Sequence, residues 1–281
     1  MIQIINTRNV FLVSVVIFTG LLFVVPQAFI PAELGNTILT VIAFLFGIIA
    51  GFYIVVTTTD YNSVKNILAT EAAGWISLYQ NVAIYDKKAA DELALLIDSF
   101  IRHSFDFEII DYAKSTNDKF RSVEKFMIEL PYNKYFDTLH GVIRENMGSI
   151  VTSRQQLTVL GTKCLSAFQW IILWALAIAF VFSLYGLRSG EFFFDLITVV
   201  ISSSAVLILM LIRDLDLYVW NEKTFCFDIF ENIFKSIGQL PYYPLDLIEA
   251  GRVKPDDKEY RVGKYVDFPK SMERTIEIRR N

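Results

Sequence analysis

Residues 37–56 read TILTVIAFLFGIIAGFYIVV, and this stretch decides the fold of the chain. From residue 41 to residue 56 there is no charged side chain, which is typical of a helix in the hydrocarbon core of a membrane. Beyond Asp60, apolar residues recur every three or four positions and so mark one face of a helix, at Val64, Ile67, Leu68, Ala72, Trp75, Ile76, Tyr79, Val82 and Ala83. No proline interrupts residues 36–80. We therefore predict one helix that spans the membrane and continues into water as far as about Tyr85.

The whole chain has the composition of a membrane protein. Its 281 residues are 54% apolar, and the apolar residues are concentrated in four blocks of about 20 residues, at 10–30, 37–56, 165–187 and 192–212. At about 1.5 Å per residue, each block is long enough to cross the ~30 Å hydrocarbon core. The first block is too long for a signal peptide and has no small-residue cleavage site after it, so we interpret it as a retained span.

Between and after these blocks, the apolar spacing is again helical. We predict an all-α membrane protein in which four transmembrane helices are continuous with a cytoplasmic helical bundle, and in which the helix before span three runs on into that span. The corresponding domains are transmembrane helices 1 and 2 (residues 1–56), a cytoplasmic helical domain (57–164), transmembrane helices 3 and 4 (165–213), and a cytoplasmic C-terminal helix and tail (214–281). From Glu259 the tail alternates weakly, which indicates an extended conformation.

The basic residues indicate how the chain is oriented. The link between spans one and two has no Lys or Arg, and the link between spans three and four has only Arg188. Nearly all other basic residues lie in the segment between spans two and three and in the C-terminal tail. Because Lys and Arg are enriched on the cytoplasmic side, we predict a multi-pass protein of the inner (plasma) membrane with cytoplasmic N- and C-termini.

Several classes of function find no support in the sequence. The net charge of −4 and the pI of about 5.3 provide no basic patch for nucleic acid. The two cysteines, Cys164 and Cys226, form no zinc motif, and neither His103 nor His140 has a second ligand four residues later. We find no catalytic or phosphate-binding motif, and so predict neither enzymatic activity nor a cofactor nor a metal site.

The first candidate site lies in residues 37–56. Phe44, Ile48 and Phe52 are spaced by four residues and share one helical face, and Gly47 and Gly51 beside them permit close approach of another backbone. A ring of such apolar residues from several subunits would form a constriction that gates by dewetting. Ordinary packing within a helix bundle would explain the same spacing.

Two further candidates are acidic. Glu71 lies on the apolar stripe of the long helix, so we predict a buried carboxylate with either an interface salt bridge or a water-filled cavity beside it. Asp214 and Asp216 follow the fourth apolar block, where paired carboxylates could hold a cation or shape ion entry. A helix-end cluster that pairs with Arg213 is the alternative.

These segments resemble a known family. Gly51-Phe52-Tyr53 after an apolar run resembles the second helix of bestrophin channels, and residues 65–79 are similar to the prokaryotic bestrophin-like family of unknown function. Asp214-Leu-Asp216-Leu-Tyr218 resembles the end of that family's fourth span, with Leu-Tyr in place of Pro-Phe. Thr59-Asp60-Tyr61 replaces the Arg-Trp-Trp of bestrophins, and the acidic calcium clasp of the animal proteins is absent.

The resemblance implies a funnel-shaped homo-oligomer in the lipid bilayer, pentameric as in bestrophins. Inorganic ions would pass along its axis, with span two around the pore and Phe44, Ile48 and Phe52 as the neck. The alternative is a non-conducting membrane scaffold or signalling protein whose cytoplasmic helices bind a partner.

Overall fold

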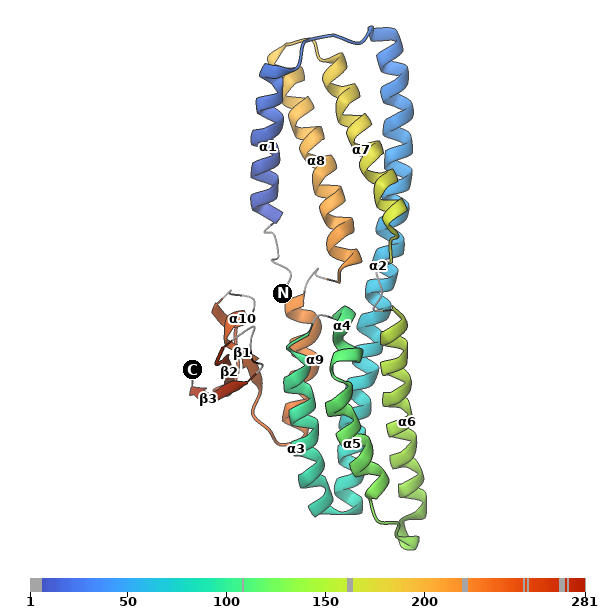
Figure 1. The fold of residues 1–281 in the computed structure, drawn as a ribbon, viewed down its shortest axis with the longest axis vertical. Helices are drawn as coiled ribbons and strands as arrows, with labels where there is room; N and C mark the ends of the chain where they lie inside the picture. Colours follow the sequence, from blue (N-terminus) through green and yellow to red (C-terminus); the bar gives the residue numbers. More distant parts are fainter. Residues whose placement is uncertain are drawn as a thin grey trace. The chain divides into compact units, whose positions relative to one another are not determined.

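The computed structural model describes residues 7–107, 109–160, 164–218, 222–249, 251, 253–267, 271 and 273–280. Most of these residues are helical (Figure 1). Their contacts divide the chain into two compact units: the first comprises Met1–Asn62 and Lys163–Trp220, and the second comprises Ser63–Thr162 and Asn221–Asn281.

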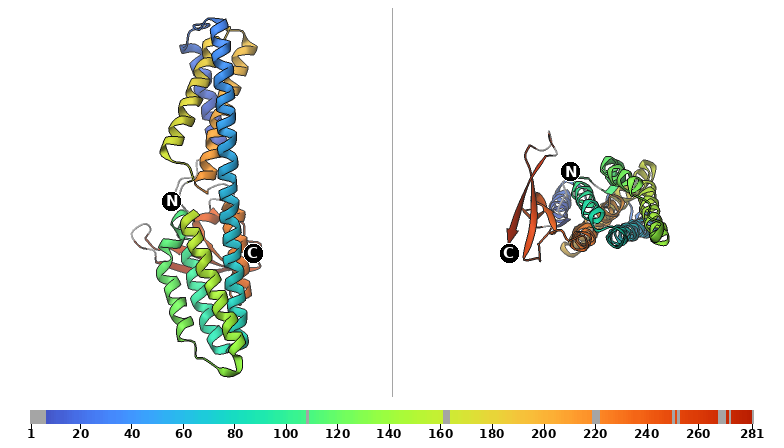
Figure 2. Two further views of the ribbon diagram at one scale, coloured as in Figure 1. Left: turned by 90° about the vertical axis from the view of Figure 1, so that its right-hand side faces the viewer. Right: turned by 90° about the horizontal axis from the view of Figure 1, so that it is seen from below.

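The longest element is helix α2 (Ala32–Tyr85), which contributes residues to both units (Figure 2). Its 54 residues confirm the prediction of a single helix through the apolar block and the amphipathic segment after it. It begins directly after Pro31, where proline is compatible with a helix start. It ends at Tyr85, and the next residue, Asp86, caps the following helix by accepting hydrogen bonds from the backbone N–H groups of Lys88 (2.8 Å) and Ala89 (3.2 Å).

Four apolar helices form the first unit. Among the described residues, three are long and apolar enough to cross a membrane: α2, α7 (Ala167–Leu187) and α8 (Phe192–Asp216). The fourth, α1 (Thr7–Val24), has a shorter apolar portion, Asn9–Val24. The expected first block extended to residue 30, whereas the helix ends at Val24 because Pro26 disfavours a helical conformation in the residue before it.

Hydrogen bonds fix the turn that follows α1 against the end of α7. The N–H groups of Ala28 and Ile30 donate to the carbonyls of Arg188 (3.1 Å) and Gly186 (3.2 Å). Gly186 makes room for the Ile30 side chain, which would have to move if position 186 carried a Cβ. The turn between α1 and α2 and the turn between α7 and α8 are thereby held together within the first unit.

The expectation that the helix before span three runs on into that span is wrong. Helix α6 (Asp137–Leu160) ends before α7, and α7 has an N-cap of its own. The Ser166 hydroxyl accepts from the N–H of Gln169 (3.3 Å), and the Gln169 side chain accepts from the N–H of Ser166 (2.7 Å). This capping box satisfies N–H groups that a continuous helix would pair with its preceding turn.

The second unit is built around helices. Besides the C-terminal half of α2, it contains α3 (Lys87–Ser104), α4 (Ile109–Ser115), α5 (Asn117–Glu129), a 3₁₀ turn (Lys134–Phe136), α6 and α9 (Glu222–Ser236). Its core centres on Trp75, whose ring lies 5.1 Å from that of Phe100 and 6.0 Å from that of Phe120. The residues of the amphipathic stripe of α2 are buried here, as the spacing predicted, at Val64, Leu68, Ala72, Trp75 and Val82.

A small mixed sheet makes the all-α expectation too narrow. Strand β2 (Glu259–Tyr265) pairs in parallel with β1 (Tyr242–Pro244) and antiparallel with β3 (Arg274–Arg280), in the order β1-β2-β3. A short helix, α10 (Leu245–Glu249), follows β1. The tail predicted to be extended therefore forms two strands, which lie along one side of the helices of this unit (Figure 2, right).

Candidate functional site

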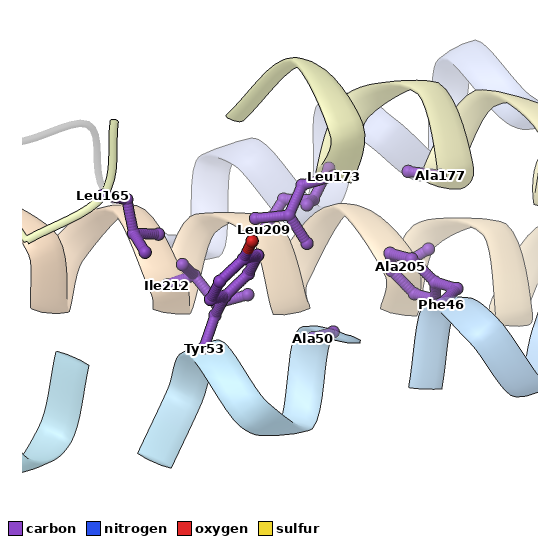
Figure 3. Close-up of a cluster of buried hydrophobic side chains, with 9 residues drawn as sticks. All are labelled: Phe46, Ala50, Tyr53, Leu165, Leu173, Ala177, Ala205, Leu209 and Ile212. Atoms are coloured by element: carbon purple, nitrogen blue, oxygen red, sulfur yellow. The ribbon is translucent and has the colours of Figure 1, made fainter. Parts of the chain in front are cut away.

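Helix α2 has two different faces within the first unit. Phe46, Ala50 and Tyr53 are buried and pack against α7 and α8, in a cluster completed by Leu165, Leu173, Ala177, Ala205, Leu209 and Ile212 (Figure 3). The opposite face carries the three predicted neck residues, and their exposed fractions are 66% for Phe44, 53% for Ile48 and 62% for Phe52. The apolar row of the candidate neck is thus the face of α2 that a single chain leaves uncovered.

The neck row is compact and has open space beside it. From Phe44 to Phe52 it covers about 12 Å of helix, at ~1.5 Å per residue. Among the described residues, a Cβ added at Gly47 or Gly51 would meet no atom of another helix within 4 Å. The close backbone approach predicted for these glycines therefore stays a prediction.

Polar residues lie above and below the neck row on the same face. Thr37 and Thr40 precede Phe44 by seven and four positions, and Thr59 follows Phe52 by seven, so all three are on the neck side of α2. Each hydroxyl donates to the backbone carbonyl four residues earlier, at 3.1, 2.8 and 2.9 Å respectively. The uncovered face is therefore polar, then apolar, then polar along the helix.

Glu71 is buried in the second unit, with 2% of its surface exposed. Its Oε1 atom accepts a hydrogen bond from Trp75 Nε1 (3.2 Å) and lies 3.7 Å from Nη1 of Arg154 on α6. The other guanidinium nitrogen of Arg154, Nη2, donates to the carbonyl of Ala113 (2.9 Å) and to the hydroxyl of Thr116 (3.0 Å). Glu71 is thus part of a buried network that joins α2, α4 and α6.

Arg154 is the centre of this network and was not identified from the sequence. Its guanidinium carbon lies 4.3 Å from the ring centroid of Phe120 and 5.0 Å from that of Phe100, so the cation lies against both aromatic rings. One signal in the sequence could have found it: Arg154 lies between Ile150 and Leu157 at helical spacing, on the buried side of α6.

Asp214 and Asp216 do not come together as the paired carboxylates of a cation site. Residues two apart on a helix point to different faces, and both belong to α8. Both carboxylate oxygens of Asp216 accept hydrogen bonds, from the N–H of Leu165 (2.8 Å) and from Trp170 Nε1 (3.1 Å). Asp216 therefore joins the start of α7 to the end of α8, and no cluster of three or more His, Cys, Asp or Glu suited to a metal occurs among the described residues.

Arg188, in the short link between α7 and α8, stabilises the ends of the membrane helices. Its side chain is 3% exposed, and Nη2 donates to the carbonyls of Leu22 (2.5 Å) and Val25 (2.7 Å), which α1 leaves unpaired at its C-terminus. Its Nη1 atom lies 3.7 Å from Asp195 at the start of α8. One buried cation thus caps α1 and pairs with α8.

We expect Arg188→Ala to destabilise the protein by about 2 kcal/mol or more, because it leaves two carbonyls without this donor and the Asp195 carboxylate without this cation. The change is measured as a fall in the thermal unfolding midpoint of the detergent-solubilised protein. Arg213→Ala is the matched control, because the Arg213 side chain contacts the Met210 sulfur (4.0 Å) and interacts with the adjacent Asp214, both on its own helix. Equal midpoints for the two variants would contradict this role for Arg188.

A second polar cluster fixes the sheet to α3. Asp98 on α3 is 4% exposed and accepts from Arg102 (2.7 Å) and from Arg261 of β2 (2.5 Å). Just beyond α3, Asp106 accepts hydrogen bonds from Arg274 of β3 and from the Tyr265 hydroxyl of β2.

Burial shifts the pKa values of two basic side chains in this cluster, Arg274 and His103. Burial, and then the neighbouring Arg102, lower the pKa of Arg274 to about 10, so it remains charged at neutral pH. Burial, and then Arg274, lower the pKa of His103 below its usual 6.5, so its ring is neutral at pH 7. Its Nδ1 atom lies 3.1 Å from Asp106. The cluster is a structural anchor in which each buried carboxylate faces an arginine.

Comparison with known proteins identifies the fold. A bacterial bestrophin homologue from Klebsiella pneumoniae matches with a TM-score of 0.60 at 13% sequence identity, covering 84% of this chain and 100% of that one. A tryptophan-to-alanine variant of the K. pneumoniae homologue matches with a TM-score of 0.61 at 13% identity, covering 83% of this chain and 99% of that one. A comparison with curated proteins found no significant match.

The family is shown by a sequence model. The Bestrophin-like domain matches residues 9–217, which is most of the chain and includes α1, α2, α7 and α8. The chain is therefore a membrane protein that belongs to the Bestrophin-like family.

Proposed function

We propose that the chain is a subunit of a homo-oligomeric ion channel in which α2 surrounds the axis. The observation that carries this proposal is the uncovered face of α2, which is apolar from Phe44 to Phe52 and polar on both sides. A single helix encloses no pore, so several chains have to place this face around a common axis. Five chains, as in the bestrophins that the sequence resembles, would form a neck of Phe44, Ile48 and Phe52 rings.

The chemistry of this face suits ion passage through a gate. An apolar ring of small radius expels water and blocks ions, whereas polar rings on either side keep the entrances hydrated. Below the neck, α2 continues with the exposed polar residues Asn62, Asn66 and Thr70 at the spacing of one face. These would line a cytoplasmic vestibule, with the first unit in the inner membrane and both termini in the cytoplasm. Their neutral side chains favour neither sign of ion.

One observation favours a second candidate, a membrane scaffold that binds a partner. Large apolar side chains are exposed on the second unit, from the end of α5 to the 3₁₀ turn before α6, with exposed fractions of 84% for Ile128, 61% for Tyr132 and 95% for Tyr135. Large exposed apolar patches mark interaction sites on water-soluble surfaces. A scaffold would use these side chains and would need no open axis.

Reconstitution separates the two candidates. The full chain is purified, its oligomer is measured by light scattering, and salt flux is recorded in liposomes with and without protein. We expect an oligomer of several chains and a flux above that of empty liposomes. Intact oligomers without flux, in the wild type and in a variant with a widened neck, would exclude conduction and favour the scaffold.

A further inference from the structure

The first unit contains an apolar groove that the proposed channel function does not use. Helices α1 and α7 both pack on α8 and leave between them a cavity of about 320 Å³. Its floor is formed by Ala205, Val206 and Leu209 of α8, and its rim on α7 includes Trp174 and Ile178.

The lining chemistry excludes water as a stable occupant. Every side chain of the lining presents apolar surface to the groove, and the one hydroxyl, of Tyr185, is already engaged with the carbonyl of Phe18 (2.5 Å). A buried water needs two to four polar partners, and this groove offers none. An empty space of this size would forfeit dispersion contacts along all three helices. The occupant that suits this lining is therefore a hydrocarbon chain.

The dimensions fit one leaflet of a bilayer. Along α7 the lining extends from Trp174 to Tyr185, which is about 16 Å at ~1.5 Å per residue and close to half of the ~30 Å hydrocarbon core. One end lies at Val25 and Tyr185, next to the two turns of the first unit that hydrogen bonds hold together. A chain that entered at this end would run from the membrane surface to the middle of the bilayer.

We propose that this groove binds one acyl chain of a membrane phospholipid from the leaflet that contacts the turn between α7 and α8. No residue of α2 lines the groove. The groove therefore faces away from the axis, towards lipid, if α2 surrounds the pore; this orientation rests on the proposed function. The bound chain fills the space between α1 and α7 and stabilises their packing on α8.

Photolabelling of the full-length protein tests this proposal. The protein is reconstituted in liposomes that contain a small fraction of phosphatidylglycerol with a diazirine in one acyl chain, and labelled residues are mapped by mass spectrometry after illumination. We expect labelling to concentrate on Val25, Ile178 and Val206, several-fold above other lipid-facing positions such as Phe193 and Ile201.

A pair of variants on α8 provides the matched comparison. Val206→Phe fills the groove from its floor, whereas Val200→Phe adds the same volume at a position that is 50% exposed outside the groove. We expect groove labelling to fall at least fivefold in Val206→Phe and to stay unchanged in Val200→Phe, with both oligomers intact by sizing. Should Val206→Phe fail to fold, the wild-type labelling map decides the question by itself.

Three results would overturn the proposal. They are even labelling of all lipid-facing positions, equal groove labelling in the two variants, and labelling of the groove by a diazirine fatty acid but not by the phospholipid. Flux is recorded from the same liposomes. A labelled groove in a protein that does not conduct would refute the channel function and leave the lipid site standing, so the two failures are distinguishable.

Discussion

Alanine in place of Phe52 is expected to raise the ion flux through reconstituted oligomers at least tenfold. Phe52 is the last ring of the apolar row before the polar Thr59, and its side chain is 62% exposed on the uncovered face of α2. Around an axis, its removal widens the neck by one aromatic ring in every subunit and lets water hydrate the constriction. A tenfold increase corresponds to a barrier lower by only about 1.4 kcal/mol, which is small compared with the cost of dehydrating an ion.

The measurement is salt flux in liposomes that carry equal amounts of oligomer. Phe194→Ala is the matched control, because Phe194 of α8 is 55% exposed but belongs to a different helix from the neck. We expect the control to conduct like the wild type. An unchanged flux in Phe52→Ala with intact oligomers, or an equal rise in Phe194→Ala, would contradict a role of Phe52 in the gate.

The course of α2 could be predicted from sequence because its signals are local. An uncharged run followed by a stripe at helical spacing specifies a helix regardless of what packs against it. The direction of its faces also follows from spacing, and Trp75 and Val82 are buried where the stripe placed them. Spacing cannot decide what the exposed face of α2 contacts, because Phe44 and Ile48 are compatible with lipid, with the wall of a pore and with a second subunit.

The ends of helices and the small sheet could not be predicted from the apolar blocks alone, because they depend on individual residues. The first apolar block continues through Pro26 to residue 30, although the proline ends α1 at Val24. Apolar spacing predicts that the helix before span three runs on into that span, whereas Ser166 and Gln169, at the spacing of a capping box, begin a new helix. The weak alternation after Glu259 predicts an extended tail but not the sheet, because β2 pairs with β1 in parallel and two arginines of the strands bind Asp98 and Asp106, which are far away in sequence.

The partners of the candidate carboxylates could not be predicted from sequence either, because they are distant along the chain. The stripe position of Glu71 predicted its burial, but its neighbour Arg154 is 83 positions away and is brought close only by the packing of α6 on α2. Asp214 and Asp216 were paired by proximity in sequence, whereas helix geometry turns them apart. Asp216 instead meets Leu165 and Trp170, which the sequence places at another helix end.

Arg154→Ala is expected to destabilise the second unit by about 3–5 kcal/mol, the range for removing one partner of a buried ion pair. The substitution takes a cation away from Glu71, removes a donor from the Ala113 carbonyl and the Thr116 hydroxyl, and leaves a cavity beside the rings of Phe100 and Phe120. The free energy of unfolding is measured by chemical denaturation of the full-length protein in detergent. Tryptophan fluorescence reports on it, because the fully buried Trp75 lies in this core.

A double-mutant cycle isolates the charge. Glu71→Gln removes the carboxylate but keeps an acceptor for Trp75, so its cost should be smaller, and Glu71→Gln with Arg154→Ala should cost less than the sum of the two single changes by at least 1 kcal/mol. Arg144→Ala is the matched control, because Arg144 lies on the exposed side of the same helix. Strict additivity in the cycle would show that Arg154 acts by packing alone. Equal stability of Arg154→Ala and Arg144→Ala would contradict any central role for the network, since a buried carboxylate that loses a cation cannot remain without cost.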